Sequence, residues 1–413
     1  MDPLPHPPSP DFFASMPIFA KVIFISMIVI VVVLLIYTCF RGYIAKTDKA
    51  SVACTQDSRV QPLNIDEFLS DIEKLKPMMF TSQQLSSATS NFSYKLGAGG
   101  FGKVYKGTLS NGINVAVKVL EGRSDHRIEA QFMAEVSTIG RTHHVNLVRL
   151  IGFCFEESMT ALVYEYMERG SLDKFLFTCK EKLGFDKLQK IAVGTAKAIA
   201  YLHEECQERI IHYDIKPGNI LLDRSFSPKV ADFGLAKLCN RDATHVTMTG
   251  GRGTPGYAAP ELWMPFPITH KCDIYSYGML LFEIVGRRRN LEMSFPESQE
   301  WLPRWVWEKF EKGEIEETLM SFEIGEENKE VAERMVLIAL WCVQYKPELR
   351  PCMSNVVKML EGGVEIFPPP NPFTHLIGGT SVMDSQQLKA ITEEEPYSET
   401  TSTMKRFEIR VDS

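Results

Sequence analysis

An unbroken apolar run near the amino terminus is the strongest single constraint on how this chain can fold. Residues 22–40 are apolar except for Ser26, Tyr37, Thr38 and Cys39. An α-helix rises about 1.5 Å per residue, so a run of this length covers the roughly 30 Å hydrocarbon core of a bilayer. A surface helix of a globular domain would have a polar face, and this run has none. The run therefore predicts a single transmembrane helix over 22–40.

A cleaved signal peptide is the alternative interpretation of this run. A signal peptide usually has a shorter apolar stretch, a basic cluster before it and a cleavage site between small residues after it, and the sequence lacks these features. Basic residues predict the orientation, because Arg41, Lys46 and Lys49 follow the run and only Lys21 precedes it. The positive-inside rule then places the C-terminal part of the chain in the cytosol, with the plasma membrane as the expected location.

Three further segments have the composition of linkers and tails. Residues 1–21 are predicted to form a short proline-rich extracytosolic stub, residues 41–90 a polar juxtamembrane linker, and residues 367–413 a disordered tail. A stub of this composition cannot build a ligand pocket. We therefore expect a co-receptor that supplies an ectodomain, or a gene model from which the ectodomain is missing.

The composition of the whole chain excludes several classes of protein. Hydrophobic residues make up 45% and charged residues 23% of the sequence, which is enough for a buried core and excludes a wholly disordered chain. The net charge of −7 argues against a nucleic-acid-binding protein, which would have a basic excess. The nine cysteines are odd in number and include no C-x-x-C pair, so we expect neither a disulfide framework nor a zinc site.

Local patterns predict a strand-rich lobe followed by a helical lobe. Alternating apolar residues predict strands within 92–109 and over 113–120, with the turn-forming pair Asn111-Gly112 before the second. A polar helix is expected over 124–141, and the chain beyond residue 170 has mainly helical periodicity.

The first candidate functional element is a glycine-rich turn at residues 97–104, with the sequence GAGGFGKV. Without side chains, backbone N–H groups can approach phosphate oxygens. Dinucleotide-binding folds have the same G-x-G-x-x-G pattern, but there a helix follows the last glycine. Here Val104 and Tyr105 continue as a strand, which favours a phosphate-binding turn between strands. A glycine-rich turn of no function is the alternative.

A lysine ends the apolar strand sequence Val115-Ala116-Val117-Lys118. A buried ammonium group without a partner is very costly. The sequence offers two kinds of anion, the phosphates of a nucleotide and the carboxylate of Glu135 on the following helix. An edge lysine that reaches water is the alternative.

Three more motifs follow in a fixed order. They are HYDIKPGN at 212–219, DFG at 232–234 and APE at 259–261. With the glycine-rich turn, Lys118 and Glu135, they resemble the motif series of the eukaryotic protein kinases. The resemblance covers about residues 91–366 and implies an α+β class, the bilobal protein kinase fold, with its N-lobe over 91–167 and its C-lobe over 168–366.

The resemblance also implies catalytic roles in phosphoryl transfer from ATP. Lys118 would bind the α- and β-phosphates while Glu135 holds it in place. Asp214 would orient the substrate hydroxyl and accept its proton, and Lys216 would contact the γ-phosphate. Glu261 would form a structural salt bridge with Arg350.

Metal and nucleotide contacts are implied in the same way. Asn219 and Asp232 would bind Mg²⁺, with Mn²⁺ as a substitute, because carboxylate and amide oxygens suit a hard cation. Adenine would contact the backbone of the hinge that follows Tyr164, the implied gatekeeper. The residues implied to bind the nucleotide are Leu96, Gly97, Ala98, Gly99, Gly100, Gly102, Val104, Ala116, Lys118, Tyr164, Glu165, Met167, Asn219 and Leu221.

Finer features indicate a subgroup. Lys216, two residues after Asp214, and Thr254 are residues that resemble those of serine/threonine kinases rather than those of tyrosine kinases. Residues 96–107 and 162–167, with the single predicted span, resemble plant receptor-like kinases of the interleukin-receptor-associated kinase type. Residues 212–219 are most similar to their leaf-rust-resistance and thaumatin-like receptor branch. We therefore expect a membrane-anchored serine/threonine protein kinase in receptor-type signalling, with protein substrates and no nucleic-acid partner.

Tyr213 departs from the commonest kinase motif, which has arginine at this position. That arginine normally pairs with a phosphate of the activation loop through bidentate bonds that a phenol cannot make. We expect activity to depend less on phosphorylation of Thr244, Thr247 or Thr249 than in arginine-bearing relatives. A simple packing role for the tyrosine ring is the alternative.

A pseudokinase signalling scaffold is the alternative function. A scaffold that performs no transfer is free to lose the catalytic residues. Lys118, Glu135, Asp214, Asn219 and Asp232 are all present, which favours an active enzyme.

Overall fold

The computed structural model of the chain describes residues 76–99, 102–121, 125–179, 182–241, 253–264 and 267–376. The predicted stub, the predicted transmembrane helix and most of the predicted linker and tail lie outside these residues. Within the described ranges, no helix combines the length and the apolar character that crossing a membrane requires.

A six-stranded sheet forms the first lobe, with the strand order β1-β5-β6-β4-β3-β2. The pair β1–β5 is parallel and the other neighbouring pairs are antiparallel. The predicted strands and the turn before β4 are confirmed, and Gly112 in that turn has a φ of 80°. The strands are β1 (Met78–Met79), β2 (Lys95–Gly99), β3 (Gly102–Thr108), β4 (Asn114–Val119), β5 (Leu150–Glu156) and β6 (Met159–Glu165).

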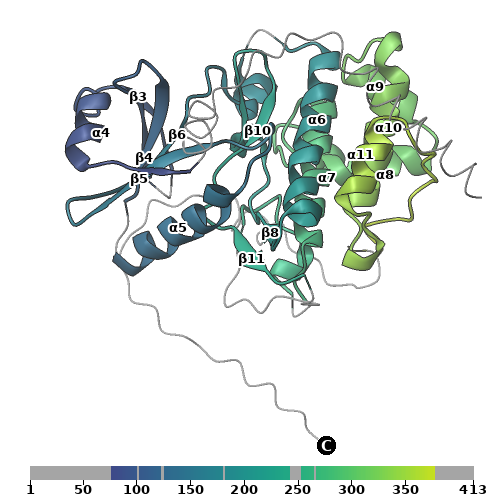
Figure 1. Cartoon of the computed structure of the whole chain (residues 1–413). Helices are drawn as coiled ribbons and strands as arrows, with labels where there is room; N and C mark the ends of the chain where they lie inside the picture. The colour runs from purple at the N-terminus through teal and green to yellow at the C-terminus, as the bar shows by residue number, and fades with distance from the viewer. Residues whose placement is uncertain are drawn as a thin grey trace, which may run out of the picture. The chain divides into compact units, whose positions relative to one another are not determined.

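Alternate residues of these strands face two different apolar clusters, as the pleat of a strand requires. Val117 and Val163 pack in one cluster with Leu85 of helix α4. Leu162 belongs to the other cluster, which includes Phe132 of helix α5. The two helices beside the sheet in Figure 1 are α4 (Ser82–Ala88) and α5 (Asp125–Thr138).

The folded lobe begins before the predicted boundary at residue 91. Thr81 and Gln84 form a capping box at the start of α4, in which each side chain accepts a hydrogen bond from the other's backbone N–H. Leu85 is completely buried against the sheet. Residues 76–90 of the predicted linker are therefore part of this lobe, because their apolar side chains cover one face of the sheet.

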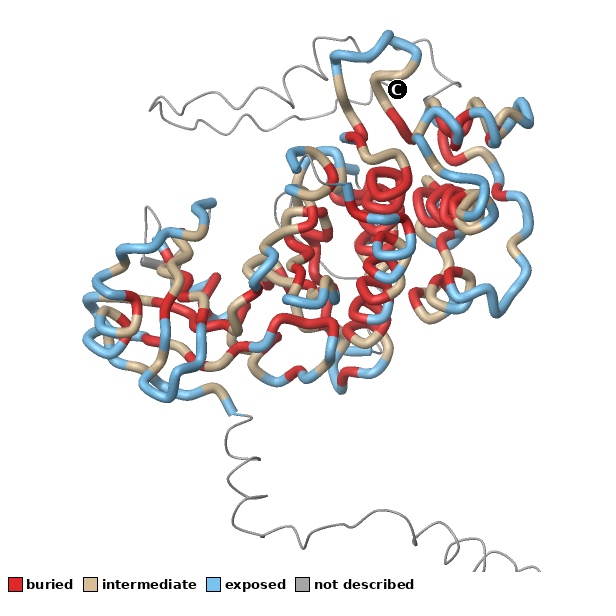
Figure 2. The backbone as a smooth tube through the Cα atoms, turned by 90° about the horizontal axis from the view of Figure 1, so that it is seen from above, coloured by how far each residue is buried: buried red, intermediate tan, exposed pale blue. Residues whose placement is uncertain are grey.

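The second lobe is helical, as predicted, with three small strand pairings at its border with the sheet-bearing lobe. Helix α7 is buried on nearly all sides, and Figure 2 shows buried residues concentrated along the central helices of this lobe. The helices are α6 (Phe185–Ala200), α7 (Lys271–Gly286), α8 (Leu302–Glu311), α9 (Ile315–Ser321), α10 (Lys329–Cys342) and α11 (Met353–Leu360); the short strands are β7 (Gly170–Ser171), β8 (Arg209–Ile211), β9 (Ile220–Leu222), β10 (Pro228–Val230) and β11 (Lys237–Cys239).

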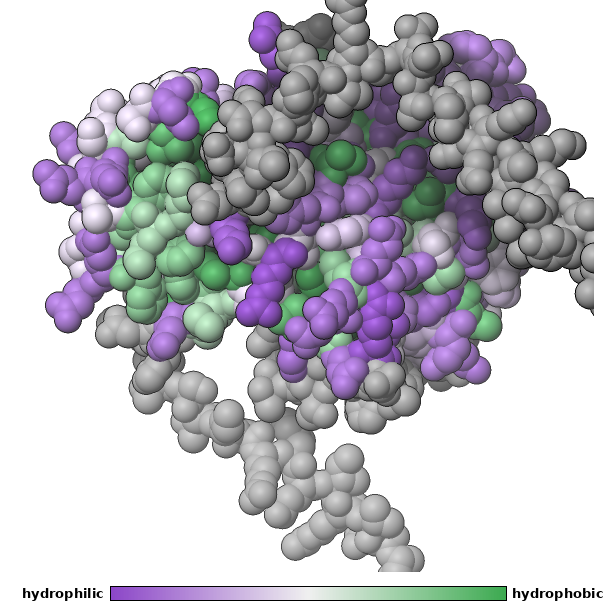
Figure 3. Space-filling model, in the orientation of Figure 1, coloured by the Kyte–Doolittle hydropathy of each residue, from purple (hydrophilic) through white to green (hydrophobic). Residues whose placement is uncertain are grey.

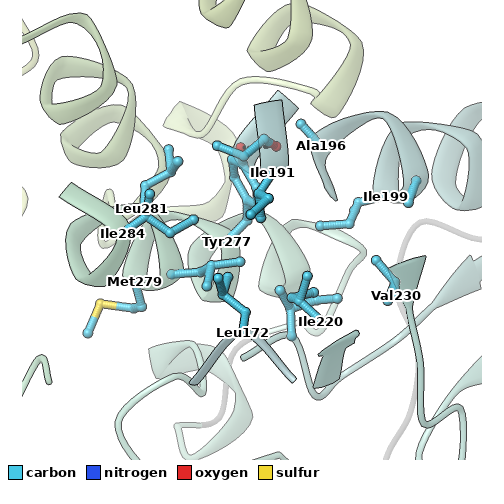
Figure 4. Close-up of a cluster of buried hydrophobic side chains, with 14 of the residues drawn as sticks. Leu172, Ile191, Ala196, Ile199, Ile220, Val230, Tyr277, Met279, Leu281 and Ile284 are labelled. Atoms are coloured by element: carbon cyan, nitrogen blue, oxygen red, sulfur yellow. Dashed lines mark hydrogen bonds between the residues drawn. The ribbon is translucent and has the colours of Figure 1, made fainter. Parts of the chain in front are cut away.

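The core of the helical lobe supports the segment between β8 and β9. Tyr277 of α7 packs with Ile191 of α6, Ile220 of β9 and Val230 of β10 (Figure 4). Its hydroxyl donates a 2.8 Å hydrogen bond to the carbonyl oxygen of Ala192, so this buried phenol has a partner. The segment that carries the predicted catalytic aspartate therefore begins and ends on packed elements.

The surfaces of the two lobes differ in polarity. In Figure 3 apolar side chains gather over the sheet-bearing lobe, whereas the visible face of the helical lobe is mainly hydrophilic. Met79, Met133 and Phe155 are among the exposed large apolar residues of the sheet-bearing lobe. The outer helices therefore direct their polar faces to solvent, because α7 fills the interior of their lobe.

The folded chain also extends beyond the predicted start of the tail at residue 367. Residues 367–376 are described, and Phe373 is only 4% exposed within the main apolar cluster. The prediction of a disordered tail was therefore wrong for these residues. Their proline-rich composition is typical of a tail, but they pack against the helical lobe.

Candidate functional site

A cavity of about 510 Å³ lies between the sheet and the helical lobe. Most of the residues predicted to bind a nucleotide line it, and Gly100 lies outside the described residues. Lys174, Val148 and Ala231 also line the cavity; they belong to no motif and were not predicted. The predicted residues in the lining are Leu96, Gly97, Ala98, Gly99, Gly102, Val104, Ala116, Lys118, Glu135, Tyr164, Glu165, Met167, Asn219, Leu221 and Asp232.

The glycines of the β2–β3 turn have two distinct roles. A Cβ added at Gly97 or Gly99 would meet no atom within 4 Å, so the space beside these residues is open to a ligand. Gly102 has a φ of 127°, and a Cβ there would lie 2.0 Å from the carbonyl oxygen of Val119. Gly97 and Gly99 therefore leave room for phosphate oxygens, whereas Gly102 is required by the approach of β3 to the end of β4.

Lys118 forms two ion pairs, one within the sheet-bearing lobe and one with the helical lobe. Its Nζ atom lies 2.6 Å from Glu135 Oε1 on α5 and 2.7 Å from Asp232 Oδ1. Burial opposes the positive charge, but the two carboxylates outweigh it and raise the pKa of Lys118 above its ordinary value. Burial likewise opposes the charge of Asp232, and Lys118 nevertheless lowers the pKa of that carboxyl. The cavity therefore contains a fixed cation between two fixed anions.

Tyr164 makes a contact that the sequence did not predict. Its hydroxyl donates a hydrogen bond to Glu135 Oε2, so both carboxylate oxygens of Glu135 have donors. Burial, followed by the charge of Glu135, raises the pKa of Tyr164 well above its ordinary value. The implied gatekeeper therefore also holds the glutamate that positions Lys118.

Asp214 lies in a compact network of donors. Asn219 Nδ2 donates to Asp214 Oδ2 over 2.8 Å, and Thr254 Oγ1 donates to Oδ1 over 2.5 Å. Lys216 Nζ lies 2.9 Å from Asp214 Oδ2 and donates to Thr254 Oγ1 over 2.7 Å. The carboxylate of Asp214 is therefore held in one orientation, with a cation beside it.

A buried aspartate of α7 holds the loop that carries Asp214. Asp273 accepts hydrogen bonds from the backbone N–H groups of His212 and Tyr213, each 2.8 Å long, and it contacts His203 Nε2 at 2.9 Å. Burial opposes the charge of Asp273, but these donors keep the pKa of its carboxyl below the ordinary value. Asp273 and His203 were not predicted from the sequence, because neither lies in one of the kinase-like motifs.

Tyr213 is 2% exposed and has a positive φ of 65°. It packs in an apolar cluster with Ile211, Ala259 and Leu262. The ring therefore lies against the segment that follows Thr254, where a charged guanidinium would be surrounded mainly by apolar atoms.

The predicted salt bridge between Glu261 and Arg350 is confirmed. Arg350 donates to both carboxylate oxygens of Glu261, and both residues are 1% exposed. It lies away from the cavity lining and is structural.

The chemistry of the donors fits a nucleotide with a hard divalent cation. Asn219 uses its amide nitrogen on Asp214, so its amide oxygen is the atom left for a cation. Asp232 places a carboxylate in the same cavity, beside the open space at Gly97 and Gly99. Oxygen ligands of these two types are those that Mg²⁺ prefers.

Comparison with known proteins identifies the same region. A sequence model described as protein tyrosine and serine/threonine kinase matches residues 90–360. The rust resistance kinase Lr10 of Triticum aestivum is 43% identical over 320 residues, which are 75% of this chain and 50% of that protein. A G-type lectin S-receptor-like serine/threonine-protein kinase of Arabidopsis thaliana is 49% identical over 304 residues, which are 73% of this chain and 35% of that protein.

A PR5-like receptor kinase of Arabidopsis thaliana is 41% identical over 318 residues, which are 74% of this chain and 47% of that protein. The chain thus spans half or less of the length of these relatives. The resemblance to plant receptor-like kinases is confirmed, and the matched region contains the cavity, the ion pairs of Lys118 and the network around Asp214. With these residues in one site and the family match across them, the chain belongs to the protein tyrosine and serine/threonine kinase family.

Proposed function

We propose that this chain is a serine/threonine protein kinase that transfers the γ-phosphoryl group of ATP to hydroxyl groups of protein substrates. The observation that carries the proposal is the position of Lys118. Its Nζ atom lies within 2.7 Å of both Glu135 and Asp232, in a cavity that Gly97 and Gly99 also line and leave open to a ligand. Phosphoryl transfer requires mainly positioning and charge neutralisation. A fixed ammonium between carboxylates on two lobes meets that requirement.

Each residue of the site has a proposed task. Lys118 binds the α- and β-phosphates, and Glu135, held by Tyr164, keeps its ammonium in place. Asp214 accepts the proton of the attacking serine or threonine hydroxyl, because its carboxylate is buried and oriented by Asn219. The side-chain oxygens of Asn219 and Asp232 would hold a Mg²⁺ ion, which would neutralise charge on the phosphates.

The decisive experiment compares the full chain with its Asp214→Asn variant. Both are incubated with labelled ATP, Mg²⁺ and a generic basic protein, and a Lys190→Gln variant on the surface of α6 serves as the matched control. The proposal predicts label transfer by the wild type and the control, and a loss of about 10²- to 10⁴-fold in Asp214→Asn. Equal transfer by all three would indicate a contaminating kinase, and no transfer by any would favour a pseudokinase scaffold.

The proposed setting is a membrane, with the kinase domain in the cytosol and a receptor-type partner outside. The apolar run at 22–40 and the basic residues after it support this topology, and the receptor-like relatives agree with it. Synthesis of the full chain with microsomes tests it. A chain that resists alkaline extraction and whose kinase domain is digested by added protease supports the topology; release by alkali contradicts it.

Tyr213 supports a further part of the proposal, namely that activity depends less on an activation-loop phosphate than in arginine-bearing relatives. Its ring is buried among apolar residues, so this position provides no cation for a phosphate group. A full chain with Thr244, Thr247 and Thr249 replaced by alanine should keep most of its transfer rate. A large loss in that variant, or after phosphatase treatment of the wild type, would contradict this part alone.

A further inference from the structure

The segment after α11 has the burial pattern of a polyproline II helix. Pro369 and Pro372 are buried and Ile366 is half-buried, whereas Phe367 and Pro368 are exposed. Ile366, Pro369 and Pro372 are thus three positions apart, which is the period of polyproline II, and this pattern ends at a turn over 372–373 in which Phe373 is also buried. Such a helix forms no internal hydrogen bonds, so its carbonyl groups are available to other partners.

The helical lobe supplies donors to this segment with the same period. The indole Nε1 of Trp341 donates a 2.9 Å hydrogen bond to the carbonyl of Phe367. The amide Nε2 of Gln344, which is 2% exposed, donates a 2.8 Å hydrogen bond to the carbonyl of Pro370. The two acceptors are three residues apart, so one turn of the proline helix matches the spacing of the two donors, Trp341 in the last turn of α10 and Gln344 just after it.

Aromatic side chains complete the binding surface. The ring of Phe373 meets that of Trp301 edge to face, with centroids 4.9 Å apart, and Phe373 is part of the main apolar cluster. Beyond it, His375 stacks on Tyr345 with ring centroids 4.0 Å apart. Figure 1 shows the yellow end of the described chain beside α10 and α11. An aromatic surface with an indole donor is the kind of site that binds proline-rich segments in other proteins.

We propose that Trp301, Trp341, Gln344 and Tyr345 form a polyproline II docking groove, which the chain fills with its own P-x-x-P-F segment, Pro369 to Phe373. The same groove accepts a segment of this type in trans once the chain's own segment is displaced. The segment follows the pair Gly362-Gly363, where Gly362 has a φ of 76°, and this short tether holds it at an effective concentration in the millimolar range. A free peptide therefore competes poorly with the intact chain.

The experiment uses the full chain in detergent and a fluorescent peptide with the sequence of residues 364–376, followed by fluorescence anisotropy. A variant in which Pro369, Pro372 and Phe373 are replaced by alanine should bind the peptide saturably at one site. The wild type should show no saturable binding at the same concentrations. A peptide with alanine at the two proline positions should not bind to either protein.

When Trp341→Phe is added to the triple alanine variant, an aromatic ring remains at position 341 but the indole N–H donor is lost. The affinity for the peptide should then fall about fivefold. The matched control is Trp263→Phe, because Trp263 is 61% exposed and distant from the segment in sequence; it should leave the affinity unchanged. Equal effects of the two substitutions would overturn the assignment of the groove.

If the triple variant does not fold, a protease site inserted between Gly362 and Gly363 replaces it. The folded chain is cleaved and diluted so that its own segment dissociates, and the labelled peptide is then added. Binding supports the proposal. A cleaved chain that keeps its circular dichroism spectrum but does not bind 1 mM peptide overturns it, and so does equal binding of the peptide by the uncleaved wild type.

Discussion

The guanidinium of Arg350 donates hydrogen bonds of 2.5 and 2.9 Å to the two carboxylate oxygens of Glu261, which is 89 positions earlier in the chain. Arg350 also donates to the carbonyl oxygens of Gln344 and Lys271, at 2.7 and 2.9 Å. One buried cation thus ties the APE motif itself to the start of α7 and to the turn that follows α10. The N–H groups of Arg350 thus donate to a carboxylate of opposite charge and to backbone carbonyl oxygens. A buried charge is tolerated when its hydrogen bonds are satisfied in this way.

Arg350→Leu should destabilise the chain by about 3–5 kcal/mol, because it leaves the carboxylate of Glu261 buried without its cation. Urea unfolding of the full chain measures this change. Arg304→Leu is the matched control, since Arg304 pairs with Glu308 on the surface and its side chain is 55% exposed; its effect should stay within about 0.5 kcal/mol. Similar losses in the two variants would contradict the structural role given to Arg350.

Two glycine substitutions in the same turn should have opposite consequences. Gly102→Ala places a Cβ 2.0 Å from the Val119 carbonyl oxygen, so it should lower stability by about 2 kcal/mol or more. Gly99→Ala meets no protein atom within 4 Å, so stability should change by less than about 0.5 kcal/mol while the KM for ATP rises. Melting curves and ATP titrations separate the two effects, and an unchanged KM in Gly99→Ala would argue against phosphate binding there.

Tyr164→Phe removes the hydroxyl that donates to Oε2 of the buried Glu135 carboxylate, whereas Lys118 and Gln131 donate to Oε1. A hydrogen bond to a charged group contributes about 1.5–3 kcal/mol, so the variant should lose stability by that amount and transfer phosphate more slowly. Tyr94→Phe, at a residue that is 61% exposed, is the control and should have no effect. A Tyr164→Phe chain with wild-type stability and rate would show that the donors to Oε1, Lys118 and Gln131, are sufficient to hold Glu135.

The stability of the chain should depend on pH through Glu283. Burial raises the pKa of this carboxyl from 4.5 to about 7, although Tyr257 and the backbone of Asn290 donate to it. The folded chain therefore keeps a proton that the unfolded chain releases. The resulting stabilisation is complete below pH 4.5 and is lost as the pH rises through 7, a change of about 3 kcal/mol at 1.36 kcal/mol per pKa unit.

Glu283→Gln has no group that titrates at this position. The unfolding free energy of the wild type should therefore fall relative to that of the variant as the pH rises from 4.5 to 7. Urea unfolding at several pH values within and above this window measures it. Parallel curves for the two proteins would show that Glu283 has an ordinary pKa.

Local sequence determined much of the sheet-bearing lobe. The Asn111-Gly112 turn, the alternation from Val115 to Lys118 and the helix after it all follow from patterns within about fifteen residues. The order of the motifs likewise predicted which side chains form the site. Each of these signals is local, because backbone propensity and strand or helix periodicity act between near neighbours.

The tertiary structure alone decided which distant groups touch. Lys118 meets Asp232 across 114 positions, and Asp273 of helix α7 holds the backbone of His212, 61 positions earlier in the chain. Pro369 and Pro372 have the composition of a disordered tail, yet they are buried in a segment whose Phe367 and Pro370 carbonyls accept hydrogen bonds from Trp341 and Gln344. No periodicity records such pairs, since their energy depends on where two remote segments are brought together when the core forms.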